Sequence, residues 1–188
     1  MDSVSWPGEV LQFLKRTVLY LTMAEKSRVK KELVQYVLVL HDIRSVFNVG
    51  ALFRTADAVG ITKIILSGYS PTPIDRFGRA RADFAKCSLG AEKTVPWEYV
   101  KTPTTYLKKL KTQGFHIIGV EQDRSSVDYK KIKKTGKVVF VLGTETTGIS
   151  KTLLKQCDTI VEIPMKGSKE SLNVSVAGGI VLYRILDK

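Results

Sequence analysis

Small polar side chains stand at the start of the last helix that the sequence predicts. Ser171 and Asn173 follow residues 163–167 (IPMKG), which have the pattern of a strand end and a glycine-containing loop. The first turn of a helix carries unpaired N–H groups and a partial positive charge, so it readily binds a polar or anionic ligand. Helix capping alone would explain Ser171. A ligand site therefore needs further polar residues that the fold brings to the same place.

Two segments upstream supply such residues. In residues 41–60, Asn48 lies near the start of a predicted helix, and Arg54 follows six residues later. In residues 138–150, an apolar run ends at Gly143, which allows the backbone to approach a ligand closely, and Glu145 follows in the loop. Ligands of open α/β sheets bind at the carboxyl ends of the strands, where both segments begin. The second segment has no GxGxxG, GxxxxGK[ST] or GxSxG pattern, which excludes the common nucleotide-binding loops and the nucleophile elbow.

Short apolar runs alternate with amphipathic stretches along most of the chain. This alternation predicts an α/β domain with a mostly parallel sheet flanked by helices. The first residues have helical periodicity, so we expect a short helical N-terminal extension over residues 1–35 and one domain over residues 36–188. The expected strands are 36–40, 63–66, 115–120, 138–142 and 159–163, and the expected helices are 47–59, 101–113, 151–156 and 172–186.

Basic and aromatic residues alternate in the long loop predicted for residues 69–86. Arg76, Arg79 and Arg81 surround Phe77, and Phe84 follows. Arginine binds phosphate groups and aromatic rings stack on bases, so the pattern is typical of RNA binding. A solvated surface loop is the alternative for the same composition.

The chain of 188 residues has a formal net charge of +12. An excess of this size indicates a polyanionic partner, and favours RNA or DNA over a membrane. The two cysteines lack CxxC spacing and there are only two histidines, which excludes a disulfide framework and argues against a metal site. No stretch reaches the roughly 20 apolar residues of a membrane span, and no signal-peptide pattern is present. We therefore expect a cytoplasmic protein without a membrane segment.

Taken together, the polar segments resemble the motifs of a known family. FNVGALFRTADAVG (47–60), VFVLGTETTGIS (139–150) and IPMKGSKESLNVSVAGGI (163–180) are similar, in this order, to motifs one, two and three of the SpoU/TrmH family of RNA ribose 2′-O-methyltransferases. CSLGAEKTVPW (87–97) resembles the family's middle region, and the likeness extends over residues 37–186. The resemblance implies the SPOUT fold. In that fold the C-terminal part of the chain forms a deep trefoil knot, an exception to the rule against threaded chains.

The resemblance also implies a cofactor, a partner chain and a set of site residues. S-adenosylmethionine is expected between the knot loops, and the RNA site is expected to be shared across a homodimer. The implied cofactor-binding residues are Leu142, Gly143, Ile163, Met165 and Leu172. The implied catalytic residues are Asn48, Arg54, Glu145, Ser171 and Asn173.

The expected reaction is methyl transfer from S-adenosylmethionine to a ribose 2′-hydroxyl of structured RNA, either tRNA or rRNA. The protein must hold the hydroxyl against the methyl carbon and help to remove its proton. Arginine stays protonated, so we expect Arg54 to clamp the target phosphate and stabilise the developing alkoxide. A phosphate oxygen or Glu145 would then accept the proton. The alternative is a catalytically weak RNA-binding or ribosome-assembly protein on the same fold, and the joint presence of the five polar residues argues against it.

Overall fold

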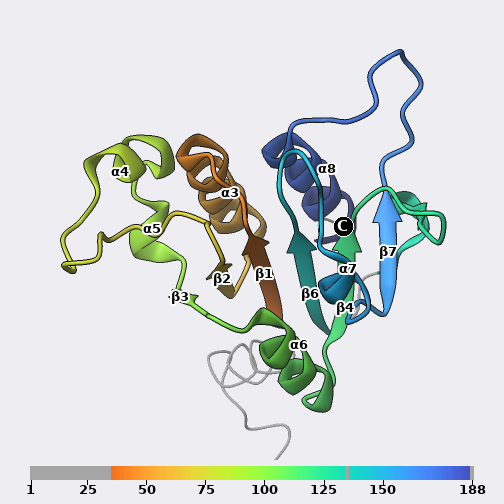
Figure 1. The fold of residues 1–188 in the computed structure, drawn as a ribbon, viewed down its shortest axis with the longest axis horizontal. Coiled ribbons are helices and arrows are strands. Elements are labelled where there is room, and N and C mark those ends of the chain that lie inside the picture. The colour runs from red at the N-terminus through yellow and green to blue at the C-terminus, as the bar shows by residue number, and fades with distance from the viewer. Residues whose placement is uncertain (1–34, 134–135, 187–188) are drawn as a thin grey trace, which may run out of the picture. The chain divides into compact units, whose positions relative to one another are not determined.

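Seven parallel strands form the sheet of this protein (Figure 1). The structure is a computed structural model that describes residues 35–133 and 136–186. The strand order is β3-β2-β1-β6-β4-β7-β5, and every neighbouring pair is parallel. The α/β class and the parallel sheet expected from the sequence are confirmed. The strands are β1 (Gln35–His41), β2 (Lys63–Ser67), β3 (Trp97–Tyr99), β4 (His116–Val120), β5 (Val127–Asp128), β6 (Lys137–Leu142) and β7 (Thr159–Glu162).

Helices cover both faces of the sheet (Figure 1). α3 and α8 pack against each other on one face, and α6 and α7 contact each other on the opposite face. The N-terminal extension expected over residues 1–35 lies outside the described residues, apart from Gln35 at the start of β1. The threading expected for the C-terminal part stays a prediction. The helices are α3 (Val46–Val59), α4 (Ala82–Ser88), α5 (Ala91–Thr94), α6 (Pro103–Thr112), the 3₁₀ helix η1 (Tyr129–Lys131), α7 (Lys151–Leu154) and α8 (Val174–Leu186).

The central strands are apolar on both sides because each side meets a helical layer. Side chains alternate between the faces of a strand. Val37 and Val39 of β1 therefore pack in the core that contains Leu107 of α6 and Leu153 of α7. Leu38, which lies between Val37 and Val39, points to the opposite face of the sheet, where α3 and α8 pack. This double burial explains the unbroken apolar runs by which the strands were predicted.

The ends of α3 follow directly from its sequence. The Ser45 hydroxyl accepts a hydrogen bond from the backbone N–H of Asn48, at 3.3 Å, and caps the first turn. Gly60 ends the helix in a left-handed conformation with φ of +77°, as predicted for a C-terminal glycine.

The segment predicted as a long loop is partly helical. Residues 82–88 form α4, and Phe84 of this helix is fully buried. Its ring lies edge-on to that of Phe53 on α3, with the ring centres 5.2 Å apart. The expectation that Phe84 stacks on bases is therefore wrong, because the ring belongs to the core.

Close contact between α3 and α4 depends on Gly50. A Cβ atom at this position would lie 2.4 Å from the Cβ of Cys87 and 3.0 Å from the Cys87 carbonyl carbon. The contact involves backbone atoms, so α4 would have to move to admit a side chain.

Gly50→Ala should therefore lower the free energy of unfolding by about 1–3 kcal/mol, although alanine favours a helix, because the core would be overpacked. Urea denaturation measures the change. Gly167→Ala is the control, since a Cβ there meets nothing within 4 Å, and its effect should stay within about 0.5 kcal/mol. Equal effects of the two substitutions would contradict the packing argument.

Candidate functional site

The polar segments singled out in the sequence meet at the carboxyl edge of the sheet. β1 and β6 are neighbours, and Leu40 is paired with Leu142, so the loops that follow the two strands start side by side. The loop after β7 reaches the same edge and leads into α8 (Figure 1). The sheet thus brings together residues that lie far apart in the chain.

Glu145 joins the loop after β6 to the start of α3. Its Oε1 accepts hydrogen bonds from the side-chain Nδ2 of Asn48, at 2.9 Å, and from the backbone N–H of Ser45, at 3.3 Å. Its Oε2 accepts one from the backbone N–H of Arg44, at 3.3 Å. Burial raises the pKa of Glu145, but these hydrogen bonds outweigh it and hold the pKa of the carboxyl below its ordinary value. The carboxylate is therefore ionised at neutral pH.

Asn48 extends this network to the start of α8. Its Oδ1 accepts a hydrogen bond from Nδ2 of Asn173, at 3.1 Å. The Oδ1 of Asn173 in turn accepts from the backbone N–H of Ser175, at 2.9 Å, and so caps α8. The helix begins at Val174, two residues later than predicted, and the capping role considered for Ser171 belongs to Asn173.

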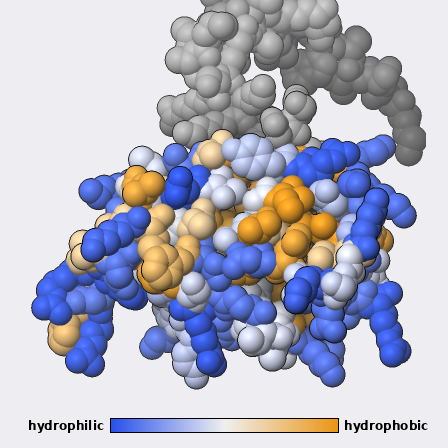
Figure 2. Space-filling model, turned by 90° about the horizontal axis from the view of Figure 1, so that it is seen from above, coloured by the Kyte–Doolittle hydropathy of each residue, from blue (hydrophilic) through white to orange (hydrophobic). Residues whose placement is uncertain are grey.

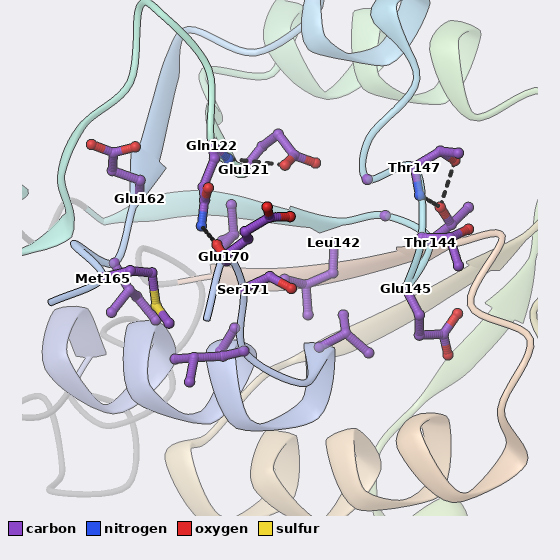
Figure 3. A pocket seen from close by; sticks show the side chains of 18 of the residues that line it. Glu121, Gln122, Leu142, Thr144, Glu145, Thr147, Glu162, Met165, Glu170 and Ser171 are labelled. Carbon is purple, nitrogen blue, oxygen red and sulfur yellow. Dashed lines mark hydrogen bonds between the residues drawn. The ribbon is translucent and has the colours of Figure 1, made fainter. Parts of the chain in front are cut away.

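A cavity of about 390 Å³ opens beside this network (Figure 3). All five predicted cofactor-binding residues line it, together with Glu145 and Ser171. Cavities of this size hold small ligands and cofactors. The five are Leu142, Gly143, Ile163, Met165 and Leu172.

Gly143 has a structural role in addition to its place in the cavity wall. A Cβ atom at Gly143 would lie 2.3 Å from the carbonyl carbon and oxygen of Gly148. The backbone groups of Thr144 and Gly148 exchange two hydrogen bonds, of 3.0 and 3.1 Å, which close the loop into a tight turn. Glycine at this position therefore permits close approach of the chain to itself, and this turn sets the position of Glu145, while the approach of Gly143 to a ligand stays a prediction.

Sequence reasoning missed several acidic and amide side chains around the cavity. Glu121 follows β4, and its Oε2 accepts a hydrogen bond from the backbone N–H of Ile149, at 2.7 Å. Figure 3 shows the side chain of Gln122 pointing to the Glu170 backbone, where Nε2 donates to the carbonyl oxygen at 2.7 Å. Glu162 and Glu170 are further acidic residues of the lining. Glu121 directly follows β4, and Glu162 is the last residue of β7. Ligands bind at the carboxyl ends of the strands, so the reasoning that predicted Glu145 could also have predicted these two residues.

Arg54 lies apart from the other predicted catalytic residues. It lines a separate hollow of about 430 Å³ beside α4 and α5, together with Ser88 and Gly90. Asn48 and Arg54 are six residues apart, or about 1.7 turns of a helix, so they leave α3 in different directions. The structure thus gathers Asn48, Glu145, Ser171 and Asn173 at the cavity but leaves Arg54 outside it.

The predicted RNA-binding arginines lie in the loop before α4. Arg79 and Arg81 are each paired with a nearby aspartate. Arg76 and Arg79 both lie over the ring of Phe77, at 4.7 and 5.0 Å from its centre, and this ring is 66% exposed. The loop therefore presents positive charge and an exposed aromatic ring, although two of the three charges are partly neutralised.

Residues 35–133 and 136–186 contain neither a metal site nor a membrane-spanning helix. No cluster of histidine, cysteine and carboxylate side chains there could hold a metal ion. In the same residues, no helix combines the length and apolar character required to cross a membrane.

Comparison with known proteins gives consistent matches over the described domain. The profile of the SpoU rRNA Methylase family matches residues 35–183. The chain is 38% identical over 150 residues to the 23S rRNA (guanosine-2′-O-)-methyltransferase RlmB of Ralstonia nicotianae, which covers 78% of this chain and 56% of that protein. It is 32% identical over 163 residues to a putative TrmH family tRNA/rRNA methyltransferase of Staphylococcus aureus, and this match covers 87% of this chain and 63% of that protein. The chain therefore spans only 56% to 63% of the length of these curated relatives.

Solved structures share the fold. The AdoMet-bound rRNA methyltransferase from Sinorhizobium meliloti superposes with a TM-score of 0.72 at 27% identity, over 80% of this chain and 55% of that chain. The TrmH/SpoU tRNA modifying enzyme from A. aeolicus gives a TM-score of 0.70 at 28% identity, over 84% of this chain and 79% of that chain.

Replacing Glu145 by glutamine should lower the free energy of unfolding by about 1 kcal/mol at neutral pH, because the backbone donors lose a charged acceptor. The folded-state pKa lies below the unfolded value, so the contribution is complete above about pH 4.3 and disappears as the pH falls through the folded pKa. Denaturation of both proteins between pH 7 and pH 3 measures the difference. A difference that does not shrink with acidity would rule out the charge as its cause.

Proposed function

Because the chain belongs to the SpoU rRNA methylase family, we propose that it transfers a methyl group from S-adenosylmethionine to a ribose 2′-hydroxyl of structured RNA. One observation carries the proposal: three loops meet at a cavity whose wall contains Glu145 and Ser171, with Asn48 and Asn173 hydrogen-bonded beside it. The names of its relatives support tRNA or rRNA as the substrate. We expect the protein to act in the cytoplasm, where these RNAs are found.

The cavity lining fits the cofactor. Leu142, Ile163, Met165 and Leu172 offer apolar surface to the adenosine. When bound, the cofactor supplies a methyl carbon that is already activated by a sulfonium charge.

The acidic residues of the cavity fit the charge of the cofactor. Glu121, Glu162 and Glu170 contribute to the wall, whereas the chain as a whole carries an excess of 12 positive charges. A negative lining favours the sulfonium and the ammonium of the cofactor over a neutral ligand of the same shape.

Glu145 is the proposed acceptor for the proton of the 2′-hydroxyl. A carboxylate has about four lone-pair sites, and the described residues supply Glu145 with three hydrogen bonds. The remaining site, and the long bond from Arg44 to Oε2, leave room for the hydroxyl to donate. A phosphate oxygen of the RNA is the other candidate acceptor.

Arg54 is the proposed clamp for the target phosphate. Its distance from the cavity within one chain is consistent with a site that a second copy completes. On α8, Val176 and Tyr183 are 49% and 47% exposed and lie seven residues apart, on one face of the helix. Figure 2 shows hydrophobic patches on one side of a largely hydrophilic surface. We infer a homodimer that uses this face of α8.

Calorimetric titration should show that the protein binds S-adenosylmethionine. Leu172→Glu should weaken binding at least about tenfold, because it places a charge where the apolar wall meets the adenosine. Leu89→Glu is the matched control, an exposed leucine outside the cavity, and should bind normally. A folded protein that does not bind the cofactor would overturn the proposal in favour of an RNA-binding role without methyl transfer.

Mixing two inactive variants tests the shared site. Arg54→Ala and Glu145→Gln should each be inactive with total RNA from a strain that lacks the gene, measured by transfer of tritiated methyl groups. If each site takes Glu145 from one copy and Arg54 from the other, an equal mixture of exchanging subunits should regain about a quarter of the wild-type activity. No recovery, despite proven subunit exchange, would place both residues in one chain's site, and near-wild-type turnover by Arg54→Ala would exclude its catalytic role.

A further inference from the structure

An exposed tyrosine and an arginine stack on each other next to the Glu145 network. Tyr69 follows β2 and is 75% exposed, and the guanidinium carbon of Arg44 lies 5.5 Å from the centre of its ring. Its hydroxyl group makes no hydrogen bond to any of the described residues. A single exposed ring is ordinary on a protein surface, but this ring is paired with a guanidinium group beside the Glu145 network.

The backbone that carries the two side chains is rigidly held. The hydroxyl of Ser70, which is only 4% exposed, donates to the carbonyl of Leu40, at 2.9 Å, and accepts from the N–H of Ile43, at 3.1 Å. These bonds connect the residue after Tyr69 to the residue before Arg44. The loops after β1 and β2 are therefore joined directly beneath the stacked pair.

A second brace comes from Asp42. Its Oδ1 accepts a hydrogen bond from the backbone N–H of Tyr69, at 2.9 Å, and Asp42 itself has a left-handed backbone with φ of +59°. Gly68 leaves room for this carboxylate, since a Cβ there would overlap it. Left-handed backbone in a residue other than glycine is uncommon and persists where the surroundings fix it, often at functional sites.

The pair also adjoins the proposed site of methyl transfer. The backbone N–H groups of Arg44 and Ser45 both donate to Glu145. Residues 42–45 therefore contact both Tyr69, through Asp42, and the Glu145 carboxylate, through Arg44 and Ser45. A ligand bound on the Tyr69 ring would lie next to this segment.

These observations fit one ligand. Proteins recognise single-stranded RNA by stacking splayed-out bases on aromatic rings and on arginine guanidinium planes. We propose that Tyr69 and Arg44 form a stacking site for an unpaired base of the substrate RNA, next to the nucleotide that is methylated. The position of this base next to a methylated nucleotide rests on the proposed function. The stacking of a base on Tyr69 does not itself require methyl transfer. Phe77, with Arg76 over its ring, offers a further exposed ring on the same loop.

The experiment uses fluorescein-labelled RNA octamers of two kinds, oligoadenylate and an abasic ribose-phosphate strand of equal charge. Fluorescence anisotropy at fixed salt gives the affinity of the full chain for each. The wild type should prefer oligoadenylate, and Tyr69→Ala should weaken its binding at least about fivefold, the lower end of what one base–aromatic stack provides. Binding of the abasic strand should be unchanged, because phosphate contacts remain.

Conservative variants separate stacking from charge. Tyr69→Phe should keep the preference, since the ring remains. Arg44→Lys keeps the charge but loses the planar guanidinium, so it should lower the affinity for oligoadenylate without changing its dependence on salt. Tyr129→Ala is the matched control. The Tyr129 ring also carries a cation, since Nζ of Lys130 lies 5.8 Å from its centre, but it follows β5 at the other edge of the sheet. This variant should bind both RNA strands normally.

Two results would overturn the stacking site: equal affinity of the wild type for both strands, or loss of less than twofold in Tyr69→Ala. The assay contains no cofactor, so a failure of methyl transfer leaves it interpretable. Calorimetry with S-adenosylmethionine should give the wild-type affinity for Tyr69→Ala, and a lost affinity would instead indicate damage to the cavity.

Discussion

The hydrogen-bonded chain from Glu145 through Asn48 to Asn173 is the interaction on which the site depends. It connects the loop after β6, the start of α3 and the start of α8. Asparagine suits the middle position because its amide donates with one end and accepts with the other. A carboxylate or a lysine there could make only half of the connection. The relative position of the three loops, and with it the shape of the cavity, is set by these few polar atoms.

The distribution of charge separates two kinds of recognition within one small domain. The chain as a whole is strongly basic, which attracts nucleic acid from a distance and without regard to sequence. The cavity is lined in part by glutamates, which favour a small cationic ligand. Elsewhere arginines lie over exposed rings, Arg44 over Tyr69 and Arg76 over Phe77, and these rings offer surfaces for contact with bases. Long-range attraction and local selection thus use different residues.

The sequence predicted the longer strands and part of the cavity wall because both follow from local patterns. Unbroken apolar runs locate buried parallel strands, and the residues directly after them locate the ligand edge, as for Gly143 and Glu145. The very short strands β3 and β5 have no such pattern, since two or three residues carry no periodicity. Phe84 was misjudged because composition does not reveal which face of α4 meets α3. The separation of Arg54 from Asn48 could have been foreseen from helical periodicity, but the hydrogen bond between Asn173 and Asn48 joins residues 125 apart and has no local sequence signal.

The hydrogen bonds that join the three loops have a consequence for the order in which this domain is assembled. Asn48 and Glu145 are 97 residues apart, and Asn48 and Asn173 are 125 apart. Contacts of such long range form late and slowly in folding, because the intervening chain must first be ordered. The network needs the chain as far as Asn173, so it is complete only after the first strands and α3 are in place. During synthesis the network therefore cannot close until α8 has left the ribosome, and the cavity takes its final shape only when the fold is complete.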